Sequence, residues 1–191
     1  ELLGAHPGSS EPAFRRPLER ILRATTNLEE TISIFLLLAR EESIRPTPGG
    51  CPLRTAAEQA VEAHQRLLEG KPVDVEIRVA ADIRIDAPEQ VLLIILGNLV
   101  SNAFQRIASG RVRIDGDEAG VAVRDTGPGI PPDLVGKVLE RHARGPTSAG
   151  HGLGLSIVRT LCDRCGWDLE IASVEGEGTR ASLRFRSSRA A

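Results

Sequence analysis

The sequence has few aromatic residues, and its positive and negative charges nearly cancel. Aromatic residues make up 3% of the 191 residues, and none of them is tyrosine. This scarcity argues against a surface of stacked aromatic side chains of the kind that binds single-stranded nucleic acid. The net charge of -2 also lacks the surplus of lysine and arginine that phosphate neutralisation requires. We therefore expect no nucleic-acid partner.

Cysteine is scarce as well, and long hydrophobic runs are missing. The three cysteines, Cys51, Cys162 and Cys165, form no dense framework, which indicates reduced, cytosolic thiols. Cys162 and Cys165 are too few for a structural metal site, which needs about four ligands. The longest apolar runs, 34–39 and 91–96, are far shorter than the roughly 20 residues that cross a bilayer. The sequence also shows no signal peptide.

A heptad pattern over about residues 12–42, within the N-terminal segment 1–43, predicts a long helix. Mostly apolar residues recur every seven positions in two series. The series are Leu18, Thr25, Ile32 and Ala39, and Ile21, Leu28 and Phe35. Such a stripe needs a partner helix, from another copy or from a part of the protein outside this chain. The alternative is a helix that lies against its own domain.

Residues 44–52 are rich in proline and glycine and are expected to link this helix to a second domain at 53–188. Within that domain, apolar periodicity predicts strands and helices. The predicted strands are 72–80, 82–86, 111–115, 120–125, 167–174 and 179–186, and the predicted helices are 54–68, 87–106 and 152–165. The pattern predicts an α+β fold, a two-layer α/β sandwich preceded by the long helix.

The predicted helix at 87–106 carries two asparagines in an otherwise apolar sequence, with Asp86 and Glu89 as an expected capping box at its start. Asn98 and Asn102 are four residues apart, so their side chains lie on one helix face. Buried carboxamides are unfavourable unless they find hydrogen-bond partners. These two either hydrogen-bond to a neighbouring loop or provide oxygen atoms to a hard cation such as Mg²⁺.

A glycine-containing segment follows the strand predicted at 120–125. Asp125 ends this strand and can accept a hydrogen bond from an exocyclic amine such as that of adenine. Gly127 and Gly129 would let the backbone approach a flat ring closely. The alternative interpretation is an ordinary Pro-Gly turn that begins at the aspartate.

Two further glycine motifs lie nearer the C-terminus. Gly150, Gly152 and Gly154 open a predicted helix and would present backbone amides to an anion. A Rossmann motif is excluded because no strand immediately precedes these glycines, and the sequence contains no Walker motif. The fourth motif, at residues 176–179 (GEGT), lies between two strands and would by itself predict only a hairpin turn.

In their order and spacing, the four motifs resemble the N box and the glycine boxes of the GHKL ATPase and kinase superfamily. The resemblance is strongest to the catalytic, ATP-binding domain of bacterial sensor histidine kinases, and it covers about residues 53–186. It implies the Bergerat α/β sandwich, with ATP and Mg²⁺ as cofactors.

The resemblance also implies a role for each motif residue. Asn102 would bind Mg²⁺, and Asn98 would be its partner, a possible metal ligand and a candidate catalytic residue. Asp125 would accept the adenine amine. The other implied ATP-binding positions are Gly127, Gly129, Ile130, Gly150, His151, Gly152, Leu153, Gly154, Leu155 and Thr179.

The stretch at 130–149 is similar to the ATP lid of this family, although the usual phenylalanine-rich box is replaced by VLERHAR at 138–144. A guanidinium fork in this lid, from Arg141 or Arg144, would meet the γ-phosphate. Arg141 is therefore a candidate ATP-binding residue, and Arg144 is a second candidate catalytic residue.

The resemblance implies a kinase that transfers the γ-phosphoryl group of ATP to a histidine, for relay to a response regulator. The helix of residues 1–43 is similar to the second helix of the family's dimerisation hairpin, which implies a homodimer. The phosphoacceptor pattern is not present, and the sequence begins at Glu1 rather than methionine, so we expect the phosphoacceptor histidine upstream of this chain. The chain would be the cytoplasmic portion of a sensor anchored in the inner membrane.

Two alternatives remain open. One is a degenerate, non-catalytic module that binds nucleotide or mediates dimerisation. The other is a conformational ATPase of the gyrase, Hsp90 and mismatch-repair branch of the superfamily. That branch typically has a glutamate four residues before the metal-binding asparagine to activate water, and this position is Asn98 here. Because an amide cannot act as a general base, the sequence disfavours hydrolysis.

Overall fold

The computed structural model describes residues 47–135 and 154–185. Both ranges belong to the second of two compact units, Glu1–Arg40 and Glu41–Ala191, into which the chain divides. The long helix expected over about residues 12–42 lies outside the described residues, and the domain boundaries derived from the sequence stay a prediction.

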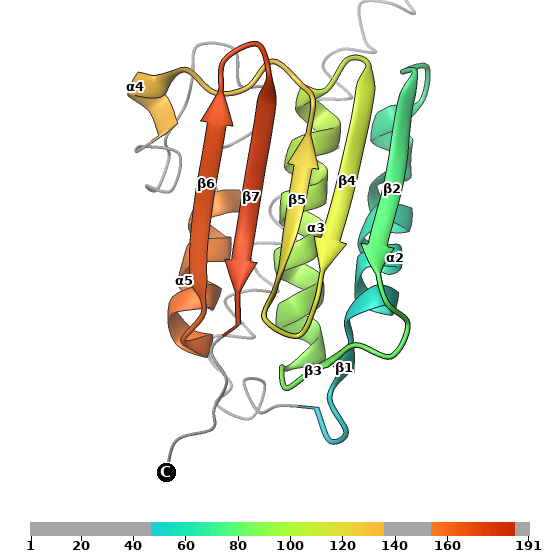
Figure 1. Ribbon diagram of the computed structural model, residues 1–191, viewed down its shortest axis with the longest axis vertical. Coiled ribbons are helices and arrows are strands. Elements are labelled where there is room, and N and C mark those ends of the chain that lie inside the picture. Colours follow the sequence, from blue (N-terminus) through green and yellow to red (C-terminus); the bar gives the residue numbers. More distant parts are fainter. Residues whose placement is uncertain (1–46, 136–153, 186–191) are drawn as a thin grey trace, which may run out of the picture. The chain divides into compact units, whose positions relative to one another are not determined.

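A mixed sheet of five strands, in the order β2, β4, β5, β7, β6, forms one layer of the described part (Figure 1). The strands are β2 (Val73–Val79), β4 (Gly110–Gly116), β5 (Gly120–Asp125), β6 (Asp168–Val174) and β7 (Gly178–Arg184). β2 and β4 are parallel, and the other neighbours are antiparallel. A second, small sheet joins β1 (Cys51–Pro52), within the predicted linker, to β3 (Arg84–Ile85).

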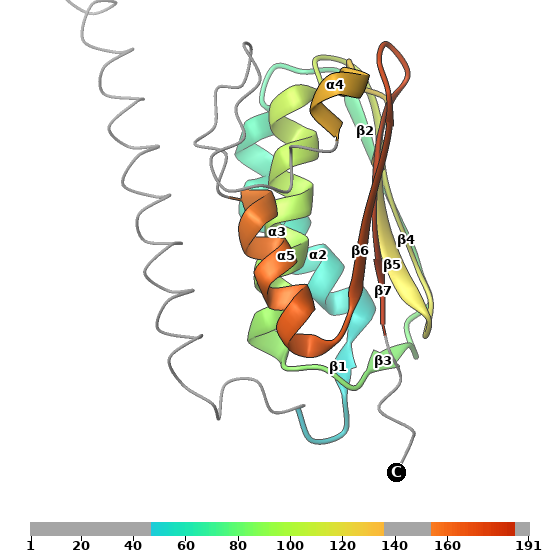
Figure 2. The same ribbon diagram turned by 90° about the vertical axis from the view of Figure 1, so that its left-hand side faces the viewer.

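Helices form the other layer. The helices are α2 (Leu53–His64), η2 (Gln65–Leu68), α3 (Glu89–Arg106), α4 (Pro132–Val135) and α5 (Gly154–Cys165). Figure 2 shows the sheet edge-on, with α2, α3 and α5 on one side of it. In the described part of the chain, no helix covers the opposite side. The predicted two-layer α/β sandwich is confirmed.

Alternating side chains distinguish the two faces of the sheet, as strand β4 illustrates. Val112 and Ile114 are fully buried against the helices. Arg113 lies between them in sequence, faces the other side and pairs with Asp115 at 2.8 Å. Partly exposed pairs of this kind contribute little stability, so the sheet is held mainly by its apolar face.

Helix α3 is the centre of the core because it packs against α2, α5 and the sheet. Its buried side chains are Val91, Leu92, Ile95, Leu96, Leu99, Val100, Ala103 and Phe104. A helix with apolar contacts on several sides is apolar around most of its circumference, which confirms the prediction of a buried central helix. Within the described residues, no helix is long and apolar enough to cross a bilayer.

Residues from elsewhere in the chain hold both ends of α3. The capping box expected from Asp86 and Glu89 is not formed, because the helix begins at Glu89 after an N-cap proline that has no side-chain cap. Thr47 supplies the missing acceptor: its Oγ1 accepts the N–H of Glu89 at 3.1 Å. At the other end, the Lys71 ammonium donates to the Phe104 carbonyl at 2.7 Å. A cation there also complements the helix dipole.

Two valines in strands provide a test of where the core lies. Val112→Ala, in β4, removes two methyl groups from a side chain that is 0% exposed, and Val174→Ala removes them from one that is 55% exposed. We expect Val112→Ala to lower the free energy of unfolding by about 2 kcal/mol, and Val174→Ala to change it by less than about 0.5 kcal/mol. Urea unfolding of both variants measures the difference. Equal losses would contradict the assignment of the buried face.

Candidate functional site

Asp125 is a buried carboxylate at the C-terminal end of β5, with 7% of the residue exposed. Its Oδ1 accepts the N–H of Gly127 at 2.9 Å, and the backbone N–H of Thr179 also donates to the carboxylate. Burial raises the pKa of Asp125, whereas these N–H bonds and the charge of Arg106 oppose the rise. A carboxylate offers about four lone-pair sites, so Asp125 can still accept a hydrogen bond from a ligand amine.

Strand pairing brings Thr179 to this carboxylate, although the two residues are far apart in the sequence. Thr179 lies directly opposite Asp125 in the antiparallel pair of β5 and β7. The candidate residues of the second and fourth sequence motifs therefore meet where β5 ends and β7 begins, in the interior of the sheet. Their assignment to adenine stays a prediction.

Two glycines allow the loop after β5 and the β6–β7 hairpin to approach each other at backbone distance. Gly178 has a φ of +120°, and a Cβ there would collide with the carbonyl of Asp125. Gly129 has a φ of +72°, and a Cβ there would collide with the carbonyl of Val174. These glycines are thus required by the packing of the chain itself, before any ligand is considered.

Ser173 is a residue of this site that sequence reasoning missed. Its Oγ accepts the N–H of Ile130 at 2.8 Å and donates to the carbonyl of Gly178 at 2.9 Å. It also lies 2.9 Å from Oγ1 of Thr179. The available signal was a single polar residue on the side of β6 that otherwise carries Leu169 and Ile171.

The second cluster of candidate residues lies where α3 meets the start of α5. Asn98 donates from Nδ2 to the carbonyl of Ile94 at 2.9 Å, while the buried Nδ2 of Asn102 has no partner among the described residues. A Cβ on Gly154 would lie 2.7 Å from Oδ1 of Asn98 and 3.6 Å from Nδ2 of Asn102. The first residue of α5 therefore lies next to both asparagines, and a side chain there would collide with Asn98.

The donor set of this second cluster fits a magnesium ion. A buried, partnerless amide is unfavourable by about 1–3 kcal/mol, and rotation of the Asn102 amide would direct its oxygen, rather than its nitrogen, toward a cation. Within the described residues, no group of three or more His, Cys, Asp or Glu side chains could hold a metal. An ion here would depend on amide oxygen, water and ligand phosphate, which is the usual way in which proteins bind Mg²⁺.

Several predicted site residues lie outside the described residues. They are Arg141, Arg144, Gly150, His151, Gly152 and Leu153. Gly154 and Leu155 are described and form the start of α5. The roles predicted for the lid arginines and for most of the phosphate-side loop therefore stay predictions.

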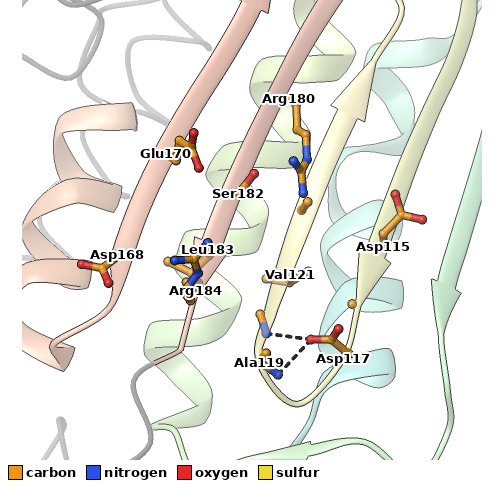
Figure 3. A pocket seen from close by; sticks show the side chains of 13 residues that line it. Asp115, Asp117, Ala119, Val121, Asp168, Glu170, Arg180, Ser182, Leu183 and Arg184 are labelled. Carbon is orange, nitrogen blue, oxygen red and sulfur yellow. Dashed lines mark hydrogen bonds between the residues drawn. The ribbon is translucent and has the colours of Figure 1, made fainter.

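The helix-free face of the sheet carries a hollow that is separate from these residues (Figure 3). Acidic and basic side chains face it together, among them Asp115, Glu170 and Arg180. None of the residues predicted from the sequence motifs lines it. We assign no part of the candidate site to this hollow.

The cysteine pair in α5 shows no features of a reactive site. Cys162 is buried, and burial raises the pKa of its thiol to about 12, while burial also raises the pKa of Cys165. Both thiols are free. Because the thiolate is the reactive and metal-binding form, these values agree with the sequence argument against a redox or metal role.

Two glycines of the β6–β7 turn give a matched test of the close approach at Asp125. Gly178→Ala would place a methyl group against the Asp125 carbonyl, whereas Gly176→Ala, also at positive φ, would meet nothing within 4 Å. We expect about 1 kcal/mol of destabilisation from the backbone conformation at Gly176 and at least about 3 kcal/mol at Gly178. Thermal or urea unfolding measures both variants, and similar values would refute the predicted collision.

Comparisons with known proteins agree with this arrangement. A family model described as histidine kinase-, DNA gyrase B-, and HSP90-like ATPase matches residues 87–189. An NtrY-like sensor histidine kinase of Rickettsia conorii is 31% identical over 182 residues, which cover 90% of this chain and 29% of that protein. The sensor protein kinase CarS of Pseudomonas aeruginosa is 36% identical over 134 residues, covering 66% of this chain and 30% of that protein.

The fold is shared with solved structures. The crystal structure of full-length ShkA in complex with AMPPNP has a TM-score of 0.71 and 24% identity, and covers 97% of this chain and 40% of that chain. The chain thus spans less than half the length of each of these three proteins. Since the family model covers more than half of the sequence, the chain belongs to the histidine kinase-, DNA gyrase B- and HSP90-like ATPases.

Proposed function

We propose that the chain is the ATP-binding catalytic portion of a sensor histidine kinase, which transfers the γ-phosphoryl group of Mg²⁺-bound ATP to a histidine upstream of this chain. ATP is the nucleotide of the family to which the chain belongs. The observation that carries the proposal is the partnerless, buried amide of Asn102 beside the first residue of α5. A helix N-terminus attracts phosphate, and the neighbouring amide is suited to the accompanying cation.

Each part of the site would then have a separate task. Asp125 and Thr179 hold the base, with the carboxylate accepting the adenine amine. The N-terminus of α5 would direct backbone amides toward the phosphates, and Asn102 would hold the magnesium ion through its amide oxygen. A bound magnesium ion would neutralise phosphate charge. The transfer breaks the bond between the bridging oxygen and the γ-phosphorus and forms a bond from that phosphorus to an imidazole nitrogen, with ADP as the leaving group.

Asn98 supports transfer to a histidine over hydrolysis. Water activation needs a group that takes up a proton, and a carboxamide is not such a group. The Nδ2 of Asn98 donates a hydrogen bond to the carbonyl of Ile94 at 2.9 Å. This bond holds the Asn98 side chain against its own helix. The residue is therefore suited to positioning near the phosphates. A conformational ATPase is the second candidate, and a nucleotide-binding module without catalysis is the third.

The remaining parts of the proposal concern the whole protein. The transferred phosphoryl group would pass to a response regulator, and the histidine would lie on a dimerisation hairpin shared by two copies. The catalytic portion would be cytoplasmic, in a sensor anchored in the inner membrane. What supports these features is the resemblance to sensor kinases, of which the chain spans 29% and 30% in two relatives.

The full-length protein incubated with γ-labelled ATP and Mg²⁺ distinguishes the three candidates. A kinase accumulates label that is labile to acid and stable to base, as expected of phosphohistidine. Steady release of labelled phosphate without labelled protein would instead identify an ATPase. Binding of ATP with neither outcome would identify a non-catalytic module. The chain of residues 1–191 by itself should accumulate no stable label.

Asn102→Ala should specifically remove the contribution of Mg²⁺ to ATP binding. Calorimetric titration of the wild type should show tighter binding of ATP with Mg²⁺ than with a chelator. In the variant, this ratio of the two affinities should be smaller by about tenfold or more. Gln105→Ala is the matched control, because it removes an exposed carboxamide from the same helix. A magnesium effect that is the same in wild type and Asn102→Ala would rule out Asn102 as a ligand.

A further inference from the structure

The hydroxyl of Ser173 is saturated with hydrogen bonds, one of them to Thr179, which is the strand partner of both Ser173 and Asp125. We propose that Ser173 is a positioning residue for purine selectivity. It accepts a hydrogen bond from the Thr179 hydroxyl, so that Thr179 can offer only acceptor lone pairs to a ligand. The inference rests on the proposed function, since it assumes that a purine base lies at Asp125 and Thr179.

The direction of each bond follows from counting protons and lone pairs. A serine hydroxyl has one proton to donate and two lone pairs with which to accept. The N–H of Ile130, at 2.8 Å, can only donate to Ser173, and the carbonyl of Gly178, at 2.9 Å, can only accept from it. The single Ser173 proton is thus used at Gly178. The contact with Oγ1 of Thr179 at 2.9 Å must then be a bond that Thr179 donates.

This direction determines what Thr179 can offer to a ligand. Once its proton points to Ser173, only lone pairs remain on Oγ1. Asp125, which lies directly opposite in the neighbouring strand, is likewise an acceptor when ionised. Two adjacent acceptors suit an exocyclic amine, which carries two N–H donors. They repel a carbonyl oxygen at the same position of the ring.

The arrangement therefore predicts preference for a 6-amino purine over a 6-oxo purine. ATP and inosine triphosphate provide the comparison, because they have the same ribose and triphosphate and differ at this edge of the base. If Ser173 is changed to a residue without a hydroxyl, the Thr179 proton is free to turn toward the ligand and donate to an oxo group. Inosine triphosphate should then gain affinity relative to ATP.

A purely structural role for Ser173 is the competing explanation. Its bond to the N–H of Ile130 ties the loop after β5 to the β6–β7 hairpin, and Ile130 is 4% exposed. Loss of that tie would weaken binding of both nucleotides by disturbing the loop. It would not change the ratio of their affinities, which is therefore the quantity to measure.

The experiment compares dissociation constants of the two triphosphates, with Mg²⁺, for Ser173→Val and Ser173→Thr. These side chains have nearly the same size and suit a strand, but only threonine retains the hydroxyl. We expect Ser173→Val to lower the preference for ATP by about fivefold or more, and Ser173→Thr to retain it. An unchanged preference in Ser173→Val, or equal losses in both variants, would overturn the proposal.

A second variant tests whether Ser173 acts through Thr179. In a Thr179→Val background no hydroxyl proton is left to direct, so adding Ser173→Val should leave the affinity ratio unchanged. A further fivefold change there would show that Ser173 acts by another route. If wild type binds neither triphosphate, the proposed function fails instead. A thermal unfolding curve for each variant confirms that the measured protein is folded.

Discussion

The burial of the Asp125 carboxylate is the constraint on which the cluster around the end of β5 depends. A charged group removed from water is unfavourable unless hydrogen bonds replace its solvation. Two of these bonds come from the backbone, at Gly127 and Thr179. Because Thr179 belongs to another strand, its contribution is available only when β7 is paired with β5 in the observed register. A shift of one residue would turn the side chains of β7 to the opposite face.

The same constraint explains why glycine is needed at both sides of Asp125. The Thr179 N–H reaches the carboxylate only if the chain just before it passes close to the end of β5, and a Cβ on Gly178 would collide with the Asp125 carbonyl. A Cβ on Gly127 would lie 2.7 Å from Oδ1 of Asp125. The glycine motifs are thus explained first by internal packing. Their value as an indication of nucleotide binding comes from their order along the chain.

Most of the architecture could be predicted from the sequence, because alternation and apolar periodicity are local properties. The strands and the buried helix α3 followed from such patterns. The start of α3 did not, since the acceptor for its first N–H comes from Thr47, which lies 42 residues away. Ser173 was missed for a related reason: one serine in a strand has no meaning until the hairpin places it against Ile130 and Thr179.

The site's two clusters lie on one connected framework. Asn98 and Asn102 belong to α3, and this helix ends at Arg106. Just beyond that end, the backbone of Ile107 lies beside Gly127, where a Cβ would be 3.6 Å from the Ile107 Cα. The loop that follows Asp125 thus packs directly against the end of the helix that carries Asn102. Since α3 is also the centre of the core, the spacing between these two groups is determined by the most buried part of the protein.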